Sequence, residues 1–580
     1  MSEITIDERR HSAAHVLAAA VLSLFPEAKM GTGPVINHGF YYDFLLPRPL
    51  IPEDLPILEK KIREISGKKI PFERFDEPID QAKAFLRKIN QPFKAELVEK
   101  FEKVGVTSVS FYKNGEVFVD LCEGPHVEHT GQIGAVKLTH FSGAYWQGDS
   151  GREQMTRIYG LCFASPGDLK NHLMLLEESK KRDHRKIGQE LDLFTFSELV
   201  GSGLPLFTPK GTFIRNKIAD TIQEIQEKYG FEKVNIPHIA KKDLYEKSGH
   251  WQKFKDDLFH VSGKGDTQFV MKPMNCPHHA QIFSSRMRSY RDLPIRYSEV
   301  TACYRDELPG ELLGLSRVRS LTQDDGHIFC RIAQIKEESK NIVSVIREFY
   351  GKLGMFEQGG YWVSLSVRDP KTPEKYLGEA SSWDEAEKVL EEIAQEEKLD
   401  YKRIEGEAAF YGPKLDFQFR DAIGREWQLA TVQVDFVQPE RFSLEYTNEK
   451  GEKERPVMIH RAIAGSLERF MSVLIEHYAG SFPAWLAPIQ VRVLPVSEAH
   501  DTYADQVVTV LREKRIRVEK SSATETLGKR IREGETSKIP FLFVVGDTEK
   551  EQETVTIRQH GKREQETVAL HASVETVLNS

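Results

Sequence analysis

The sequence has few of the features that mark secreted or membrane proteins. Its 5 cysteines in 580 residues show no regular pairing, which fits a reducing compartment better than a disulfide framework. It contains no apolar run of about 18 residues that could span a membrane. The amino-terminal stretch MSEITIDERR is charged at once and lacks the apolar region of a secretory signal. These absences predict a cytoplasmic protein with no membrane association.

Common nucleotide and metalloprotease motifs are missing as well. Neither a Gly-x4-Gly-Lys-Ser/Thr loop nor a Gly-x-Gly-x-x-Gly turn between a strand and a helix occurs, so side chains must hold any phosphates. The residue after His11 is serine, which excludes the His-Glu-x-x-His motif. Because the net charge is −8, nothing global indicates nucleic-acid binding, and any basic surface must be local.

What is present predicts a globular, multidomain protein. Hydrophobic residues make up 40% and charged residues 29% of the chain, and the length suggests about three or four domains. Residues 1–165 mix strands such as GFYYDF and GEVFVDL with helices, and residues 166–190 read as one long charged connecting helix. Residues 191–484 form a larger region after a glycine-rich break, and residues 485–580 alternate strands with amphipathic helices. The expected fold class combines α/β and α+β domains.

Two His/Cys pairs with the same spacing lie in the first region. His11 and His15 are four residues apart and would share one face of a helix. Cys122 and His126 have Gly124 and Pro125 between them, which favours a turn. The four side chains could be the ligands of a tetrahedral metal ion or a cluster that activates water, and they could equally be incidental.

The central region contains a helix and a polar hairpin. The steps between the apolar residues from Ile214 to Tyr229 predict an amphipathic helix that Gly230 ends. Further on, two strands joined by a Pro-Gly loop would place Arg305 and Glu307 on one face of a sheet. Arginine suits phosphate because its planar guanidinium binds two oxygens and keeps its charge. An ordinary exposed hairpin is the alternative, but it does not explain the polar run TQDDGH between apolar segments.

A second metal set is possible in the same region. Cys276, His327 and His460 are far apart in the sequence and lie beside turn or strand residues. Three such ligands with an open fourth position describe a catalytic zinc ion, whereas scattered Cys and His are often core residues. Spacing alone leaves both interpretations open.

The motifs resemble those of the class II aminoacyl-tRNA synthetases, and specifically the threonyl branch, over essentially the whole chain. EKYGFEKVNIP resembles motif 1, CYRDE with RVRSLTQDD resembles motif 2, and GSLERF resembles motif 3. KPMNCP, TQDDGHIF, AAFYGPKLDF, TVQVDF and MIHRAIAGSLERF resemble segments specific to the threonyl branch. RHSAAH and DLCEGPH resemble an editing module shared with alanyl enzymes. The chain begins at that module, so it resembles a form without the amino-terminal ubiquitin-like domain.

This resemblance implies a class II catalytic core on an antiparallel sheet (191–484), preceded by an α+β editing domain (1–165) and the connector (166–190). An α/β anticodon-binding domain (485–580) follows. The implied activity is ATP-dependent ligation of L-threonine to tRNA(Thr) through threonyl-adenylate, with Mg²⁺ accompanying ATP and a homodimer forming through the motif 1 helix. One zinc ion per subunit would be held by Cys276, His327 and His460.

The resemblance also implies a role for each remaining site residue. Arg305 would contact the α-phosphate and the substrate carboxylate, Glu307 the adenine edge, and Arg317 and Arg469 the γ-phosphate. The threonine and adenylate pocket would be lined by Gln323, Asp325, Tyr411, Lys414, Gln428 and Gln433. Leu321 stands where the family usually has an aromatic residue, so adenine would lack one stacking face.

The first-region cluster then becomes an editing site that hydrolyses Ser-tRNA(Thr). Its members would be His11, His15, Cys122 and His126, supported by Asp120 and Lys94, and we favour a metal-free site. In the last domain, RNA contacts are expected from Lys529, Arg530, Arg532 and Arg558. Two alternatives remain: a synthetase-derived RNA-binding regulator without catalysis, and a deacylase that uses only the first region.

Overall fold

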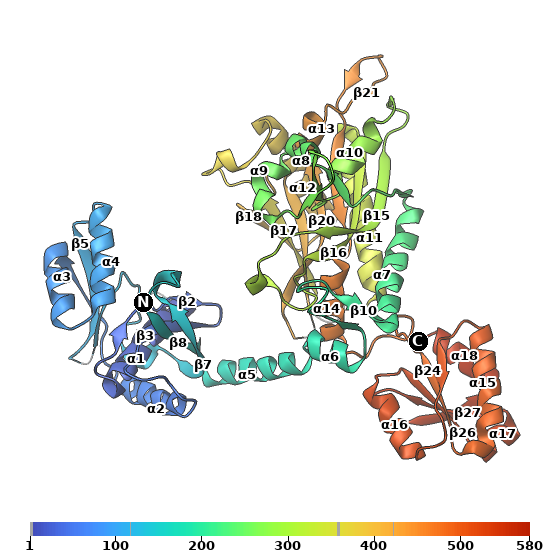
Figure 1. Cartoon of the computed structure of the whole chain (residues 1–580), viewed down its shortest axis with the longest axis horizontal. Coiled ribbons are helices and arrows are strands. Elements are labelled where there is room, and N and C mark those ends of the chain that lie inside the picture. Colours follow the sequence, from blue (N-terminus) through green and yellow to red (C-terminus); the bar gives the residue numbers. More distant parts are fainter. Residues whose placement is uncertain (1–3, 117, 357–359, 422) are drawn as a thin grey trace. The chain divides into compact units, whose positions relative to one another are not determined.

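The computed structural model describes residues 4–116, 118–356, 360–421 and 423–580. The chain divides into two compact units, Met1–Glu177 and Glu178–Ser580. Figure 1 shows the elements of each unit. Within the described ranges no helix is long and apolar enough to cross a membrane.

The first unit is organised around the helix α1 (Ile6–Leu24). Thr5 caps it, because its hydroxyl accepts the Glu8 N–H at 3.2 Å while the Glu8 carboxylate accepts the Thr5 N–H at 2.7 Å. The alanine-rich side of α1 is buried, and the helix packs on an antiparallel sheet in the order β1-β3-β8-β7, with β2 paired to β3. The elements around α1 are β1 (Lys29–Met30), β2 (Val35–Ile36), β3 (Gly39–Leu45), α2 (Asp54–Gly67), β7 (Ala135–Tyr145) and β8 (Gln154–Phe163).

A smaller three-stranded sheet completes the described part of this unit, in the order β4-β5-β6. Its elements are β4 (Glu73–Pro78), α3 (Ile79–Lys88), α4 (Pro92–Lys103), β5 (Ser108–Asn114) and β6 (Phe118–Leu121). The strand expected at GEVFVDL is β6, and Val117 of that stretch lies outside the described residues. The segment after β6 is a turn and not a helix, as predicted, and Gly124 adopts a φ of 80° there.

The prediction of one long connecting helix is wrong. The segment forms two helices, α5 (Pro166–Lys181) and α6 (His184–Glu190). Asp183 separates them with φ −51° and ψ 117°, and its carboxylate accepts the Arg185 N–H at 2.8 Å. Aspartate thus ends one helix and caps the next, because its side chain competes for backbone N–H groups.

The second unit contains an eight-stranded sheet among its described residues, in the order β11-β15-β16-β23-β20-β19-β17-β18. Neighbouring strands are antiparallel except at the two edges, where β11 pairs with β15 and β17 with β18 in parallel. The strands are β11 (Glu232–Lys233), β15 (Ile295–Tyr304), β16 (Ser320–Cys330), β17 (Tyr361–Val367), β18 (Tyr401–Glu405), β19 (Lys414–Arg420), β20 (Glu426–Asp435) and β23 (Val457–Ala462).

Helices pack on both sides of this sheet. The main hydrophobic core lies under α7 (Pro209–Lys228), α11 (Ile335–Lys352) and α14 (Leu467–His477). The predicted amphipathic helix is α7: Ile214, Ile218, Ile222 and Ile225 are fully buried, and Gly230 follows it with a φ of 76°. On the other side, α10 (Cys276–Ser284) contacts β16, and α8 (Lys242–Ser248) and α9 (His250–Phe254) lie near it (Figure 1).

The helix α12 and several short elements complete the described part of this region. They are β9 (Phe194–Thr195), β10 (Leu206–Phe207), β12 (Ile239–Lys241), β13 (His260–Ser262), β14 (Gln268–Met271), α12 (Ala380–Glu396), α13 (Val437–Arg441), β21 (Tyr446–Thr447) and β22 (Lys453–Glu454).

The predicted hairpin is present as β15 and β16, but its polar end differs from the prediction. β15 ends at Tyr304, so Arg305 and Glu307 lie in the following loop and not on the sheet. The Arg305 N–H still reaches the Arg319 carbonyl at 2.9 Å, while the Asp306 N–H turns to the Asp257 carbonyl at 2.9 Å. The loop therefore leaves the strand ladder one residue after β15.

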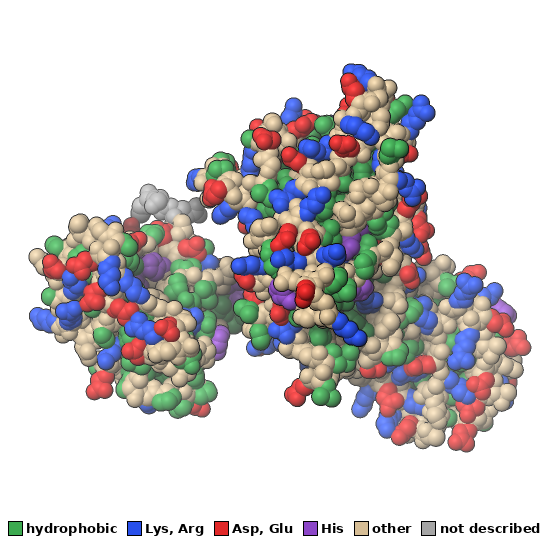
Figure 2. Space-filling view, turned by 45° about the horizontal axis from the view of Figure 1, so that its top comes forward, with side chains coloured by type: hydrophobic (Ala, Val, Ile, Leu, Met, Phe, Trp, Pro, Cys, Tyr) green, Lys and Arg blue, Asp and Glu red, His purple; other side chains and the backbone are tan. Residues whose placement is uncertain are grey.

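The carboxy-terminal part has a mixed sheet in the order β25-β24-β26-β27-β28. Its elements are β24 (Val491–Pro495), α15 (Asp501–Glu513), β25 (Val518–Lys520), α16 (Leu527–Thr536), β26 (Phe541–Val545), α17 (Asp547–Gln552), β27 (Thr554–Gln559), β28 (Gln565–Ala569) and α18 (Leu570–Leu578). Figure 2 shows Lys and Arg side chains interspersed with Asp and Glu on this part.

One expected RNA contact in this domain is wrong. Arg530 is only 2% exposed, and its guanidinium donates inward to the carbonyls of Glu525 and Pro495 at 2.9 and 2.8 Å. A side chain with these internal partners has no free donor surface for phosphate. Lys529 and Arg532 are exposed on the same helix.

Candidate active sites

Four strands of the large sheet bring polar side chains into one row. Lys414 on β19 pairs with Gln433 on β20, Gln433 with His460 on β23, and His460 with His327 on β16. Because directly opposed residues project from the same face of a sheet, these four side chains lie side by side. The row joins residues that are up to 133 positions apart in the sequence.

Cys276, His327 and His460 form a compact buried cluster at one end of this row. Their possible ligand atoms all lie within 4.8 Å of one another. Nε2 of His327 and Nδ1 of His460 are 3.0 Å apart, and Cys276 reaches them from the first turn of α10. The structure therefore brings the three expected metal ligands together.

Hydrogen bonds around the cluster orient the two imidazoles. Nε2 of His460 lies 2.7 Å from Oδ2 of Asp435, so its other nitrogen is left facing the cluster. Nδ1 of His327 lies 2.7 Å from Nδ1 of His279, whose Nε2 is 3.6 Å from Glu299. Imidazoles supported in this way are typical metal ligands, and one sulfur with two nitrogens suits a tetrahedral cation with an open position. Sequence reasoning missed Asp435, His279 and Glu299, because the residue that each one contacts lies on a different strand or helix.

A cavity of about 340 Å³ is lined by Arg305, Glu307 and Arg317. Nη2 of Arg317 is 2.6 Å from Oε2 of Glu307, so the predicted nucleotide residues are paired with each other. Arg469, on α14, donates from Nε to the Ser316 carbonyl at 3.1 Å, which places it beside the residue that precedes Arg317. His250, which also lines the cavity, lies 3.9 Å from the Cys276 sulfur, so the cavity adjoins the Cys/His cluster.

Asp416 organises several of the expected threonine-pocket residues, although the sequence did not reveal it. Nζ of Lys414 is 2.6 Å from this carboxylate, and Nε2 of Gln428 donates to it at 2.8 Å. The Thr431 hydroxyl donates at 2.8 Å as well. The Ser366 hydroxyl donates at 3.1 Å, so four groups compensate the charge of this buried carboxylate.

The other expected pocket residues lie around the same row. The Tyr411 ring is 5.1 Å from that of His460, and Nε2 of Gln433 donates to the Gly412 carbonyl at 3.2 Å. Gln323 and Asp325 alternate with Asp324 along β16 and so share the face of His327. Burial raises the pKa of the Asp325 carboxyl, while an N–H of Asn275 donates to it at 2.9 Å.

The first unit contains a second site, a cavity of about 610 Å³ lined by His11, His15, Lys94, Asp120 and Cys122. The Cys122 sulfur lies 3.3 Å from Nε2 of His11 and 3.3 Å from Nε2 of His126. The structure thus gathers the six residues that the sequence selected for this site. His11 faces the Pro125 carbonyl with Nδ1 at 3.2 Å; because a carbonyl only accepts, Nδ1 carries the proton and Nε2 is an acceptor.

Asp120 anchors the base of this second site. Its Oδ1 forms an ion pair with Nζ of Lys94 at 2.7 Å, its Oδ2 accepts the Tyr42 hydroxyl at 2.5 Å, and Nε2 of His15 is 3.6 Å away. Tyr42 was missed by sequence reasoning, although it lies in the strand GFYYDF that the sequence predicted. All three partners are buried, which makes Asp120 an internally compensated carboxylate.

Burial keeps the imidazoles of this site neutral. Desolvation lowers the pKa of His11 and lowers the pKa values of His15 and His126 well below that of a free imidazole. It also raises the pKa of the Cys122 thiol to about 11. At neutral pH, His11 is therefore a proton acceptor and Cys122 is a thiol.

These lowered pKa values predict acid sensitivity of the first unit. Below about pH 6.5 the unfolded chain binds protons at His11, His15 and His126 that the folded unit excludes. The free energy of unfolding is therefore highest above that pH and decreases as the pH falls, by up to ~1.4 kcal/mol per pH unit for each histidine. Hydrogen exchange of α1 amides at pH 7.5 and 5.5, corrected for intrinsic rates, measures this. A His15→Gln variant should have a shallower dependence; equal protection at both pH values would contradict the prediction.

The comparisons with known proteins agree with this arrangement. Residues 259–478 match the family described as tRNA synthetase class II core domain (G, H, P, S and T). Residues 490–580 match the anticodon binding domain, and residues 109–159 match the threonyl and alanyl tRNA synthetase second additional domain. The antiparallel sheet with its polar row, together with these domains, defines a class II aminoacyl-tRNA synthetase.

Relatives identify the branch. The chain is 48% identical to the threonine--tRNA ligase of Gloeobacter violaceus, over 97% of this chain and 91% of the relative. It is 46% identical to that of Thermus thermophilus, over 98% of this chain and 88% of the relative. The chain belongs to the threonine--tRNA ligase family.

Solved structures show the same fold. A structure described as the RNA binding domain of threonyl-tRNA synthetase from Cryptosporidium parvum has a TM-score of 0.64 and 36% identity, covering 69% of this chain and 98% of that one. Prolyl-tRNA synthetase from Giardia lamblia has a TM-score of 0.53 at 17% identity, covering 67% and 75%, which shows a shared fold.

Proposed function

We propose that this chain joins L-threonine to tRNA(Thr) through a threonyl-adenylate and hydrolyses Ser-tRNA(Thr) at a second site. The observation that carries the proposal is the row Lys414, Gln433, His460 and His327, which lies on one sheet face beside Cys276. We assign residues 1–165 to editing, 166–190 to the connector, 191–484 to catalysis and 485–580 to anticodon binding.

Cys276, His327 and His460 would hold one zinc ion per subunit. When bound, the ion would offer its open position to the amino and hydroxyl groups of threonine. The chain's own contribution is to orient the ligands: Asp435 fixes the His460 ring at 2.7 Å, and His279 fixes that of His327 at 2.7 Å. Asp325, on the same face, would accept a hydrogen bond from the threonine hydroxyl.

Arg305, Arg317 and Arg469 would bind the phosphates of ATP, with Mg²⁺ accompanying the nucleotide. Arg305 would meet the α-phosphate and the threonine carboxylate, Glu307 the adenine edge, and Arg317 with Arg469 the γ-phosphate. Their fixed charge offsets the charge that builds up as the carboxylate attacks phosphorus, which is catalysis by positioning and electrostatics. ATP must separate the Arg317–Glu307 ion pair to make these contacts.

Gln323, Tyr411, Lys414, Gln428 and Gln433 would complete the pocket for threonine and the adenylate. Asp416 supports two of them, Lys414 at 2.6 Å and Gln428 at 2.8 Å. Leu321 is partly buried opposite Cys303 on β15, where it would cover adenine without an aromatic stacking face.

Editing follows from the small difference between threonine and serine. Serine retains the hydroxyl and lacks only a methyl group, worth ~1–3 kcal/mol, so one binding site cannot exclude it well enough. In the first unit, Nε2 of His11 would take a proton from a water that attacks the ester carbonyl. The bond to the ribose oxygen then breaks, His11 returns the proton to that oxygen, and serine and tRNA are released. Cys122, His126, Asp120, Lys94 and His15 would position this water and the ester without a metal ion.

A homodimer formed through the region of α7 and a cytoplasmic location complete the proposal. Both rest on the family resemblance, and the location also suits an enzyme that supplies aminoacyl-tRNA for translation.

Threonine-dependent exchange of pyrophosphate into ATP tests the synthetic half directly. We expect exchange that requires threonine and zinc-replete protein. An RNA-binding regulator would show none, and a free-standing deacylase would show only hydrolysis of Ser-tRNA(Thr). Exchange without dependence on threonine would contradict the substrate assignment.

A further inference from the structure

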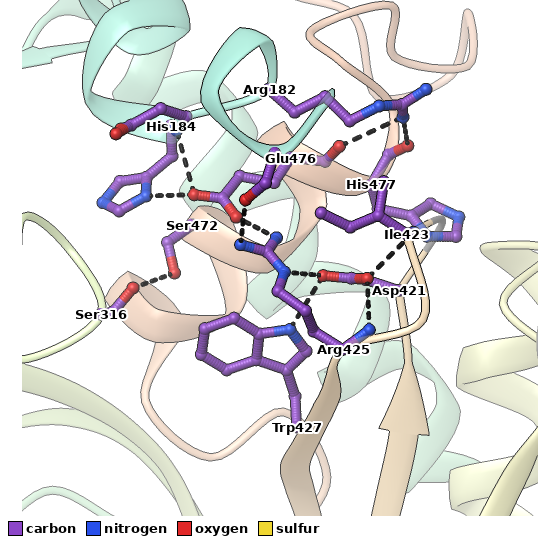
Figure 3. Close-up of polar contacts among 12 residues, drawn as sticks. Arg182, His184, Ser316, Asp421, Ile423, Arg425, Trp427, Ser472, Glu476 and His477 are labelled. Atoms are coloured by element: carbon purple, nitrogen blue, oxygen red, sulfur yellow. Dashed lines mark hydrogen bonds and ion pairs between the residues drawn. The ribbon is translucent and has the colours of Figure 1, made fainter. Parts of the chain in front are cut away.

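A buried polar cluster lies outside both sites, where α14 meets α6 and the β19–β20 turn. We call it the Glu476 cluster: Arg182, His184, Asp421, Arg425 and Glu476 (Figure 3). Glu476 is 6% exposed, and its Oε1 receives the His184 backbone N–H at 3.1 Å and lies 2.6 Å from His184 Nδ1. Arg425 binds its other oxygen and also donates from Nε to Asp421 at 2.7 Å. Arg182 donates to the His477 carbonyl at 2.9 Å.

The partners of His184 fix its protonation on geometry alone. Nε2 receives the backbone N–H of Leu315 at 3.0 Å, so this nitrogen must be the acceptor. Nδ1 therefore carries the proton and donates to Glu476. His184 is 3% exposed and Leu315 is fully buried, so water cannot replace either bond.

These contacts also argue against a metal ion in this cluster. His184, Glu476 and the neighbouring Asp183 could ligate one by position. Both nitrogens of His184 are already hydrogen-bonded, however, and Arg185 binds the Asp183 carboxylate at 2.6 Å. The cluster is a set of satisfied hydrogen bonds.

Leu315 belongs to a tight turn that ends at Arg317, one of the proposed nucleotide arginines. The turn spans residues 313–317, and the Leu313 N–H donates to the Arg317 carbonyl at 3.1 Å. Gly314 has a φ of 50°, and a Cβ built there would lie 2.3 Å from Nε2 of His184. The histidine ring is therefore in direct contact with this turn.

Arg317 and Arg469 are both connected to the 313–317 turn, which His184 contacts. Arg317 follows Leu315 by two residues and projects to Glu307 in the nucleotide cavity. Arg469 donates to the Ser316 carbonyl at 3.1 Å, and the Ser316 hydroxyl is 2.9 Å from that of Ser472 on α14. A shift of Leu315 would move Arg317 and the acceptor of Arg469 together.

We propose that His184 is a positioning residue for nucleotide binding: held by Glu476, it fixes the 313–317 turn through the Leu315 amide and thereby sets Arg317 and Arg469. This inference rests on the proposed role of these arginines. It gives a function to a histidine within the run KKRDHRK, which would otherwise be read as a solvated stretch.

Two amide substitutions separate the two bonds of His184. Asparagine places an N–H near the position of Nδ1 and keeps the Glu476 bond but leaves the Leu315 N–H without an acceptor. Glutamine places its oxygen near the position of Nε2, so it accepts from Leu315 and loses Glu476. In the exchange assay we expect His184→Asn to raise the KM for ATP about tenfold, ~1.4 kcal/mol, and to change the KM for threonine less than twofold. We expect His184→Gln to keep the KM for ATP within about threefold.

Further measurements separate positioning from general stability. Hydrogen exchange of the peptide containing Leu315 should accelerate in His184→Asn and stay close to the parent rate in His184→Gln. Arg296→Gln is the matched control, because it removes a partly buried ion pair with Glu338 at 2.6 Å in the same unit, outside this turn. It should lower Tm and leave the KM for ATP unchanged.

The outcomes are distinct. With a parent enzyme that exchanges, two results would overturn the inference. One is an unchanged KM for ATP in His184→Asn. The other is an equal increase in the KM for ATP in both variants that parallels their loss of Tm. A parent protein that shows no exchange would refute the proposed function, and with it the nucleotide role given to His184.

Discussion

With Cys276 as a ligand of the proposed zinc ion, Cys276→Ser is expected to retain no zinc and to lose threonine-dependent exchange activity by more than ~100-fold. A hydroxyl is a harder and weaker ligand than a thiolate, and a site with only three protein ligands loses most of its affinity when one of them is weakened. Burial raises the pKa of the Cys276 thiol well above its usual value, so only a cation can make it a thiolate there. Metal analysis of the purified variant and the exchange assay measure the two losses.

Cys330→Ser is the matched control for this experiment. Cys330 is fully buried on β16, three residues after the proposed ligand His327, and lies in the hydrophobic core away from the cluster. It should be destabilised by a buried hydroxyl yet retain its zinc and its KM for threonine. If Cys276→Ser kept full zinc occupancy and normal activation, Cys276 would not be a ligand.

Local patterns predicted the parts of the sites that lie within one element. The four-residue spacing of His11 and His15 places both on one helix, and Gly124 with Pro125 indicates the turn that carries Cys122. The polar run TQDDGH is part of the strand β16, as its position between apolar segments predicts. Consecutive residues of a strand point to opposite faces, so Asp324 and Asp325 find partners on opposite sides of the sheet.

Contacts between distant elements could not be predicted in this way. Asp416 and Asp435 compensate site residues on neighbouring strands, and nothing in their local sequence states which strand will be next to them. The charge of Arg530 predicts a surface RNA contact, but three backbone carbonyls accept hydrogen bonds from its guanidinium and hold it in the interior. His184 was hidden for the same reason, since its partners Leu315 and Glu476 lie 131 and 292 residues away.

His11→Ala combined with Cys122→Ala should leave threonylation nearly intact and let Ser-tRNA(Thr) accumulate. The double variant removes the acceptor Nε2 of His11 and the thiol 3.3 Å from it, and both substitutions lie in the first unit. Losing the proton acceptor should slow deacylation by ~10²- to 10⁴-fold, the usual contribution of a general base. Because the residues proposed to bind threonine and ATP belong to the other compact unit, the effects on the two activities should be independent.

A packing role for these residues makes a different prediction, and a matched variant separates the two. His140→Ala with Cys162→Ala changes the same residue types in the same unit, at an exposed strand position and in the hydrophobic core. It should lower the stability of that unit, measured by hydrogen exchange of α1, while clearance of Ser-tRNA(Thr) continues. The His11/Cys122 variant should keep the stability of the unit and lose clearance of Ser-tRNA(Thr), since His11 and Cys122 are only partly buried and line a cavity. If the folded His11/Cys122 variant cleared Ser-tRNA(Thr) at the parent rate, this cluster could not be the editing centre, whatever its effect on stability.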